Sequence, residues 1–223
     1  MSHRNGALLF KAGPAAFEDI RKRGFSSERI GTIAGASGGA KWLVLSQLDR
    51  VMVNEVLPAI AGPVHLIGSS IGAWRFACYA QDDPLAAIER FEEAYLAQTY
   101  SDKPDVAEIT AKTREILKHV IGPQGAQQIV EHARCRLHIM TVRCGYLTAT
   151  DWRPLLTAGL LIAAAGNVFS RRSLGLFFSR ALFFDSRELP PFYNASGFPL
   201  HRVPLTAENL GDAVMASGAI PLV

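Results

Sequence analysis

The sequence predicts an α/β fold: a three-layer sandwich in which a mainly parallel sheet is flanked by helices. Two observations predict it. Short apolar runs alternate with longer segments of helical periodicity, which is typical of parallel sheets. Two turns of the form G-x-S-x-G, GASGG at 35–39 and GSSIG at 68–72, each follow an apolar run and lead into a helical segment. Reactive groups of such sheets gather beyond the carboxyl ends of the strands, where both turns are expected.

Strands are expected where short runs are apolar and rich in β-branched residues. These runs are residues 7–10, 30–34, 64–67 and 137–142, with weaker candidates at 182–184 and 199–203. Helices are expected where apolar residues recur every three or four positions. In chain order these segments are 14–23, 41–60, 71–80, 84–97, 106–120, 124–133 and 207–215. Pro14 and Gly24 bound the first helix, and Thr206 is the expected N-cap of the last. We expect one domain over 1–223.

Composition narrows the classes of function. The 223 residues are 49% hydrophobic, enough for a substantial core, and the formal net charge is +3 without a Lys/Arg tract, which argues against a nucleic-acid partner. The three cysteines form no C-x-x-C pair, so the sequence predicts neither a disulfide framework nor a metal site, and we expect no cofactor. The apolar N-terminal stretch is too short for a secretory signal, so a cytoplasmic location is expected.

The second turn fits a nucleophile elbow. In that motif a serine sits on a strained strand-to-helix turn, and small neighbours allow the backbone to bend tightly. Gly68 and Gly72 flank Ser70 in this way, after an apolar strand and before a helix. The N-terminus of that helix favours the anion formed when an acyl group is attacked.

The first turn has a different character. Gly38 and Gly39 allow consecutive backbone N–H groups to point into one space, which is how an oxyanion hole is built. The pattern alone also allows Ser37 to be the nucleophile. His65, in the strand before the second turn, is expected to be buried and hydrogen-bonded rather than catalytic.

Three blocks of the sequence resemble the patatin-like phospholipases. SGGAKWLVLSQLDR resembles the family's glycine-rich oxyanion segment, usually G-G-G-x-[RK]-G. GSSIGAWRFACYAQDDPLAAIERF resembles its nucleophile segment, and LTAENLGDAVMASGAIPLV resembles its A-S-x-A-x-P segment. The blocks follow the family's order and cover 31–98 and 203–223.

The resemblance implies a patatin-like fold and a serine acyl hydrolase that cleaves phospholipid or other fatty acyl esters through an acyl-enzyme. Ser70 would be the nucleophile, and Gly38 and Gly39 would supply the oxyanion N–H groups. Lys41 matches the basic residue of the loop and would steer an anionic substrate. An alternative of another class is a catalytically inactive lipid-binding or scaffold module.

The sequence departs from the family pattern in two ways. Ser37 and Trp42 stand where the family usually has glycines. The family's catalytic aspartate lies in a D-G-[GA] motif, and no Asp-Gly dipeptide occurs in this sequence. We therefore expect the aspartate beyond Val223, in a domain incomplete at its C-terminus. A triad of Ser70 and His201 with Asp151 or Asp185 is the alternative within the chain.

The segment 151–185 is rich in Leu, Ala and Phe and is interrupted by arginines. One interpretation is an amphipathic flap that contacts a membrane surface, with its arginines at phosphate head groups. The other is a core helix with solvated arginines. A peripheral membrane location depends on the first interpretation.

Overall fold

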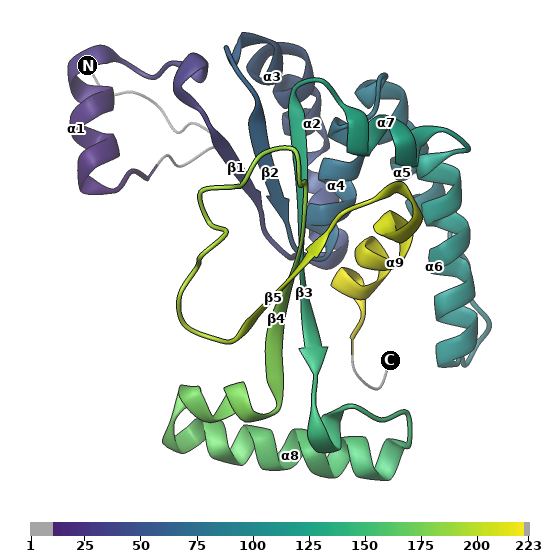
Figure 1. Ribbon diagram of the computed structural model, residues 1–223. Coiled ribbons are helices and arrows are strands. Elements are labelled where there is room, and N and C mark those ends of the chain that lie inside the picture. The colour runs from purple at the N-terminus through teal and green to yellow at the C-terminus, as the bar shows by residue number, and fades with distance from the viewer. Residues whose placement is uncertain (1–10, 221–223) are drawn as a thin grey trace, which may run out of the picture.

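The computed structural model describes residues 11–220 and contains a five-stranded sheet whose spatial order follows the chain (Figure 1). Its strands are β1 (Thr32–Gly35), β2 (Val64–Gly68), β3 (Cys135–Cys144), β4 (Phe178–Phe184) and β5 (Leu200–Pro204). Strands β1, β2 and β3 are parallel, β4 is antiparallel to β3, and β5 is parallel to β4. The predicted α/β fold with a mainly parallel sheet is confirmed. The strand expected at 7–10 lies outside the described residues.

The α-helices of the described residues are α1 (Pro14–Arg23), α2 (Ser46–Val51), α3 (Leu57–Ala59), α4 (Ile71–Tyr79), α5 (Pro84–Leu96), α6 (Val106–Ile121), α7 (Gly125–Glu131), α8 (Arg153–Phe169) and α9 (Ala207–Gly218). Local signals fix several ends. Pro14 opens α1, the Asp83 side chain accepts a hydrogen bond from the Ala86 N–H, and Thr206 forms a capping box with Asn209.

The helix expected over 41–60 is present as a continuous helical segment over 39–59, but it is not a single regular α-helix. A 3₁₀ segment, η2 (Gly39–Leu45), precedes α2, and a π turn, η3 (Met52–Val56), separates α2 from α3. Pro58 has no N–H to donate within α3. Within η2 the buried Trp42 stacks on Phe91 of α5, with ring centroids 4.4 Å apart. Trp42, at a position where the family usually has a glycine, is therefore part of the hydrophobic core.

The main core lies on one face of the sheet. Alternate residues of β2 and β3, including Leu66 and Leu137, are buried in it. Helices α4, α7 and α9 pack against the sheet, and α5 and α6 pack beyond them (Figure 1). This layer places α4 over the carboxyl ends of β1 and β2.

The opposite face carries a buried histidine pair. Nδ1 of His65 and Nε2 of His138 are 2.9 Å apart, and the ring of Phe192 lies edge-on to His138 at 5.1 Å. Burial lowers the pKa of both histidines, that of His138 to about 3. The expectation that His65 is buried and hydrogen-bonded is confirmed.

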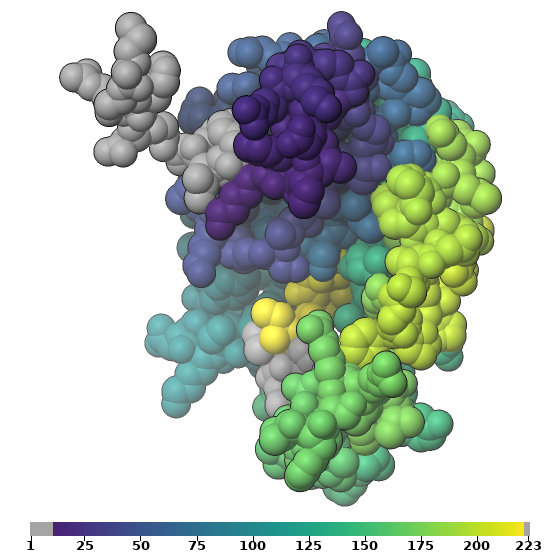
Figure 2. Space-filling model, turned by 90° about the vertical axis from the view of Figure 1, so that its left-hand side faces the viewer, coloured from purple at the N-terminus to yellow at the C-terminus, as the bar shows by residue number. Residues whose placement is uncertain are grey.

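Helix α8 belongs to a lobe beyond the ends of β3 and β4. The helix packs on two 3₁₀ segments, η4 (Tyr146–Thr148) and η5 (Arg171–Leu176), and together they project from the molecule (Figures 1 and 2). Leu161 is 66% exposed and Phe169 is 91% exposed, so the interpretation of α8 as a core helix is wrong. Only β4, at the end of the 151–185 segment, is part of the sheet. No helix within residues 11–220 has the length and hydropathy to span a bilayer.

Candidate active site

The two serine-containing turns meet at one edge of the sheet. The register of β1 and β2 pairs Gly35 with Gly68, the first glycines of the two turns. The Ser69 N–H donates to the Gly35 carbonyl over 3.1 Å, and the Ser37 hydroxyl lies 3.2 Å from that of Ser69. Segments that are similar in sequence therefore form one composite structure.

Close packing under α4 requires glycine at two positions. A Cβ atom on Gly72 would lie 2.2 Å from the carbonyl oxygen of Gly35, and one on Gly68 would lie 2.5 Å from the backbone N of Ala73. Neither contact is sterically acceptable, and backbone atoms cannot be moved aside as a flexible side chain can. The approach of α4 to the strand ends therefore depends on both glycines.

Ser70 has a strained backbone. Its φ of 53° and ψ of −127° lie outside the regions that non-glycine residues readily adopt, at a cost of roughly 1–3 kcal/mol. The Ser70 N–H donates to Oγ of Ser217 over 2.7 Å, and Ser217 donates in turn to the Met140 carbonyl over 2.8 Å. Tertiary contacts from α9 and β3 thus hold the turn between β2 and α4.

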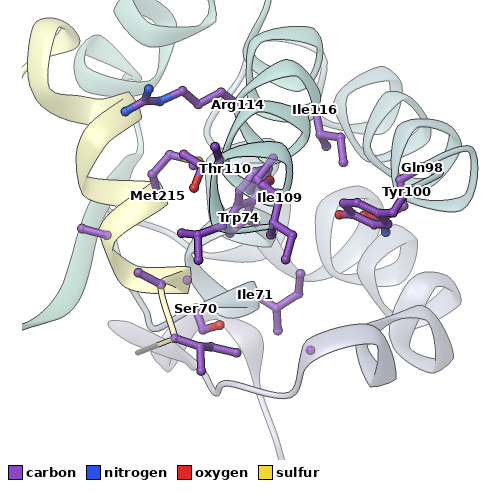
Figure 3. Close-up of a pocket in the computed structure, with 18 of the residues that line it drawn as sticks. Ser70, Ile71, Trp74, Gln98, Tyr100, Ile109, Thr110, Arg114, Ile116 and Met215 are labelled. Carbon is purple, nitrogen blue, oxygen red and sulfur yellow. The ribbon is translucent and has the colours of Figure 1, made fainter. Parts of the chain in front are cut away.

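Ser70 lines a cavity of about 1110 Å³ that Gly39 also lines. In Figure 3, Ser70 and Ile71 lie at one end of this cavity and Arg114 lies at the other. The apolar part of its wall comes from α4, α5, α6, α8 and α9, and includes Ile71, Trp74, Phe91, Ile109, Ile116, Leu156 and Met215. Its charged residues are Asp105, Arg114, Asp151, Arg153 and Asp212. The space is large enough for a long apolar group attached to a polar one.

The first turn contributes open backbone donors. Gly39 has a φ of 53°, a left-handed conformation that glycine adopts without strain. Within residues 11–220, the N–H groups of Gly38 and Gly39 donate no hydrogen bond to the protein. Gly38 precedes Gly39 but does not itself line the cavity. Lys41 is exposed in η2 and lies outside the cavity wall, so the structure does not bring it to Ser70.

The alternative triad is not assembled. His201 is exposed on β5, three strands from β2, which is about 14 Å at the usual spacing between strands. Asp185 is buried and accepts a hydrogen bond from Nε of Arg187 at 3.0 Å. Asp151 lines the cavity. Among the described residues, no carboxylate or imidazole is hydrogen-bonded to Oγ of Ser70.

The sequence patterns do not reveal a buried network that joins α2, which follows the first turn, to α4, which follows the second. Nε of Arg75, on α4, donates to both carboxylate oxygens of Asp49, on α2, over 3.0 and 2.9 Å. The Tyr79 hydroxyl donates to the same carboxylate over 2.5 Å, and burial raises the pKa of that hydroxyl. Arg75 is itself buried, with 9% of its surface exposed.

Ser217 was also missed as a support of Ser70, since its only signal was its place in the A-S-x-A-x-P segment. Each of these contacts joins residues far apart in sequence, which no local pattern reveals. Comparison of the chain with protein-family models, with curated proteins and with solved structures found no match.

Proposed function

We propose that this chain is a serine acyl hydrolase of patatin-like type, with a three-layer α/β fold, that cleaves phospholipid or other fatty acyl esters at Ser70. One observation carries the proposal: a non-glycine residue is held in a strained conformation where a strand turns into a helix, at the wall of a cavity that Gly39 shares. Such strain persists where surrounding contacts enforce it, and it clusters at active sites. A glycine-rich turn with only a structural role would not require a strained backbone at a serine.

In the proposed reaction, Oγ of Ser70 attacks the acyl carbonyl carbon. A C–O bond forms while the carbonyl π electrons move to oxygen, and the N–H groups of Gly38 and Gly39 donate to that oxyanion. The serine proton passes to a base, a role that the family resemblance assigns to an aspartate. When the oxyanion collapses, the ester C–O bond breaks and the departing alcohol takes up that proton. Water then hydrolyses the acyl-enzyme and restores the Ser70 hydroxyl.

The wall chemistry supports an acyl substrate. Apolar side chains from five helices line the cavity alongside Ser70, and they provide an apolar surface for a hydrocarbon chain. The charged residues of the same cavity suit the polar remainder of an ester. Ser37 is the weaker nucleophile candidate, because its hydroxyl faces Ser69 and it does not line the cavity.

A second candidate is a lipid-binding or scaffold module that keeps the cavity without turnover. The observation that favours it is that, in the part of the chain described here, no acid or base is hydrogen-bonded to Oγ of Ser70. Such a module would bind a fatty acid in the cavity, and it would release no product from an ester.

Hydrolysis of p-nitrophenyl butyrate and p-nitrophenyl palmitate tests both candidates. The hydrolase predicts turnover that falls at least about 10³-fold in Ser70→Ala and stays within a few-fold in Ser37→Ala. Loss of activity in Ser37→Ala alone would instead identify Ser37 as the nucleophile. The binding module predicts no turnover in any variant but displacement of a fluorescent fatty acid by palmitate.

A further inference from the structure

Helix α8 exposes several large apolar residues that an ordinary surface helix would bury, while Leu155, Leu156 and Leu160 are half-buried. Its buried positions are small residues, Gly159 and Ala163, and a Cβ atom on Gly159 would lie 2.9 Å from Leu147. Its exposed side carries large apolar residues at helical spacing: Leu161, Ile162, Val168 and Phe169, here named the α8 outer face. A helix that folds only against its own protein in water places its large apolar residues inward. The α8 outer face is therefore shaped to contact something apolar outside the molecule.

Exposed apolar side chains concentrate in this lobe. Of the nineteen large hydrophobic residues that are exposed among the described ones, nine lie between Val142 and Leu176. They include Tyr146 and Trp152, aromatic residues with a polar group, which favour the boundary between water and hydrocarbon. Single exposed hydrophobic residues need no explanation, but a cluster of this kind marks an interaction surface.

The charges around the outer face are mostly positive. Residues 143–177 contain four arginines, Arg143, Arg153, Arg171 and Arg172, and the single acidic residue Asp151. None of the four arginine side chains is in an ion pair with another described residue. No charged residue interrupts α8 between its first residue and its end. Arginines at both ends of an uncharged apolar face match the phosphates of anionic lipids.

The lobe is also continuous with the cavity. Arg153 and Leu156, in the first turns of α8, line the same cavity as Ser70. In Figure 2 the green lobe lies below the body of the molecule, and the end of α9 is visible in the hollow between them. An ester held at a surface under α8 would therefore lie at the rim of the cavity.

We propose that the α8 outer face, with Arg171 and Arg172 at its end, docks the protein onto the surface of a bilayer that contains anionic phospholipid. The helix lies in the plane of the surface, with its apolar residues in the acyl region and its arginines among the phosphates. Docking would present the cavity to lipid. The catalytic role of this docking rests on the proposed function. A second copy of the chain is a poorer occupant, because face-to-face association would bring two sets of unpaired arginines together.

Vesicle co-sedimentation tests the docking. We expect the 223-residue chain to pellet with vesicles of phosphatidylcholine and phosphatidylserine, and far less with phosphatidylcholine alone. The double variant Val168→Asn/Phe169→Ser should bind at least tenfold more weakly, because it removes the two most exposed apolar side chains of the face. Arg171→Gln/Arg172→Gln should lose about fivefold per arginine and should lose the dependence on phosphatidylserine.

The matched control is Leu96→Ser on α5, a 69% exposed leucine outside both the lobe and the cavity wall. It should bind vesicles like the unmodified chain. Circular dichroism of every variant shows whether the fold is kept, and exposed positions leave it intact. Absence of vesicle binding, or equal binding by Val168→Asn/Phe169→Ser, would overturn the proposal. Dimerisation in sedimentation velocity that this variant abolishes, without vesicle binding, would assign the face to a second copy.

Hydrolysis of p-nitrophenyl butyrate separates this proposal from the proposed function. The small ester does not need a bilayer, so the α8 variants should keep its hydrolysis while losing vesicle binding. Ser70→Ala should show the reverse, with normal vesicle binding and no hydrolysis. Loss of vesicle binding alone would therefore contradict the docking proposal, and absence of ester hydrolysis alone would contradict the proposed function.

Discussion

The backbone N–H of Ser70 donates a hydrogen bond to the side-chain oxygen of Ser217, 147 positions away in the sequence, over 2.7 Å. Because Ser217 also donates to the Met140 carbonyl, one hydroxyl group joins the turn after β2, the end of α9 and the central strand β3. The strained conformation of Ser70 is thus supported by a contact outside its own turn.

Replacing Ser217 by alanine removes this support. We expect Ser217→Ala to lower the free energy of unfolding by about 1–3 kcal/mol, because a backbone N–H and a carbonyl lose their partner in a half-buried site. Urea unfolding measures the change. Ser217→Thr keeps a hydroxyl group and should recover most of the loss; an alanine variant as stable as the unmodified chain would show that the bond does not support the turn.

Two glycines of helical segments make a matched pair. We expect Gly72→Ala to destabilise the protein by about 3 kcal/mol, because the new methyl group would overlap the Gly35 carbonyl. Gly211→Ala, in α9, has no heavy atom within 4 Å of its new methyl group and should stabilise by up to about 1 kcal/mol. Thermal unfolding of both variants checks the opposite signs. Equal effects would contradict the close approach of α4 to β1.

The ion pair between Asp49 and Arg75 is expected to be essential to stability. Asp49→Ala leaves the buried Arg75 guanidinium without its partner, which should cost about 3–5 kcal/mol. Lys112→Ala removes one partner of the exposed Lys112–Glu115 pair on α6 and should cost less than about 1 kcal/mol. Chemical denaturation of the two variants gives the comparison, and similar losses would show that the buried network does not join α2 to α4.

The histidine pair predicts loss of stability in mild acid. The pKa of His138 is lowered to about 3 in the folded protein, and that of His65 is lowered as well. The unfolded chain binds these protons first, so stability is complete above about pH 6.5 and is lost as pH falls below that value. The slope for one histidine is at most about 1.4 kcal/mol per pH unit.

Urea unfolding between pH 7.5 and 5.0 measures this slope above the range in which most carboxylates titrate. His138→Gln should reduce it relative to the unmodified chain. His132, whose pKa burial also lowers, contributes to the slope in both proteins and therefore cancels in the comparison. An unchanged slope in His138→Gln would assign the acid sensitivity to other groups.

Local signals predicted most elements but not how all of them pair. The Asp83 side chain accepts a hydrogen bond from the Ala86 N–H, and Thr206 forms a capping box with Asn209. Both helix starts are thus fixed by contacts three residues apart, which a sequence pattern contains. The antiparallel pairing of β4 with β3 could not be predicted from such local patterns. Helix α8 has the length of a crossover helix, yet it lies beyond the sheet, so the chain returns alongside β3 in the opposite direction.

In the candidate site, too, local features could be predicted and contacts between distant residues could not. The strand, turn and helix around Ser70 could be predicted because they and their glycines are consecutive in the sequence. The burial of Trp42 in the helical segment after Gly39 could not be predicted, because its stacking on Phe91 depends on α5, more than forty residues later. The exposure of α8 was hidden for a related reason: an apolar segment has the same composition in a core and at an interface, and only packing distinguishes the two.

The division of roles between the two turns can be measured by mapping the site of reaction with a fluorophosphonate probe, which forms an adduct with an activated serine. Mass spectrometry of the digested protein should find one adduct, on the peptide containing Ser70. It should be lost in Ser70→Ala and kept in Ser37→Ala. An adduct on Ser37, or no adduct on the chain at all, would contradict the assignment of Ser70 as the reacting serine.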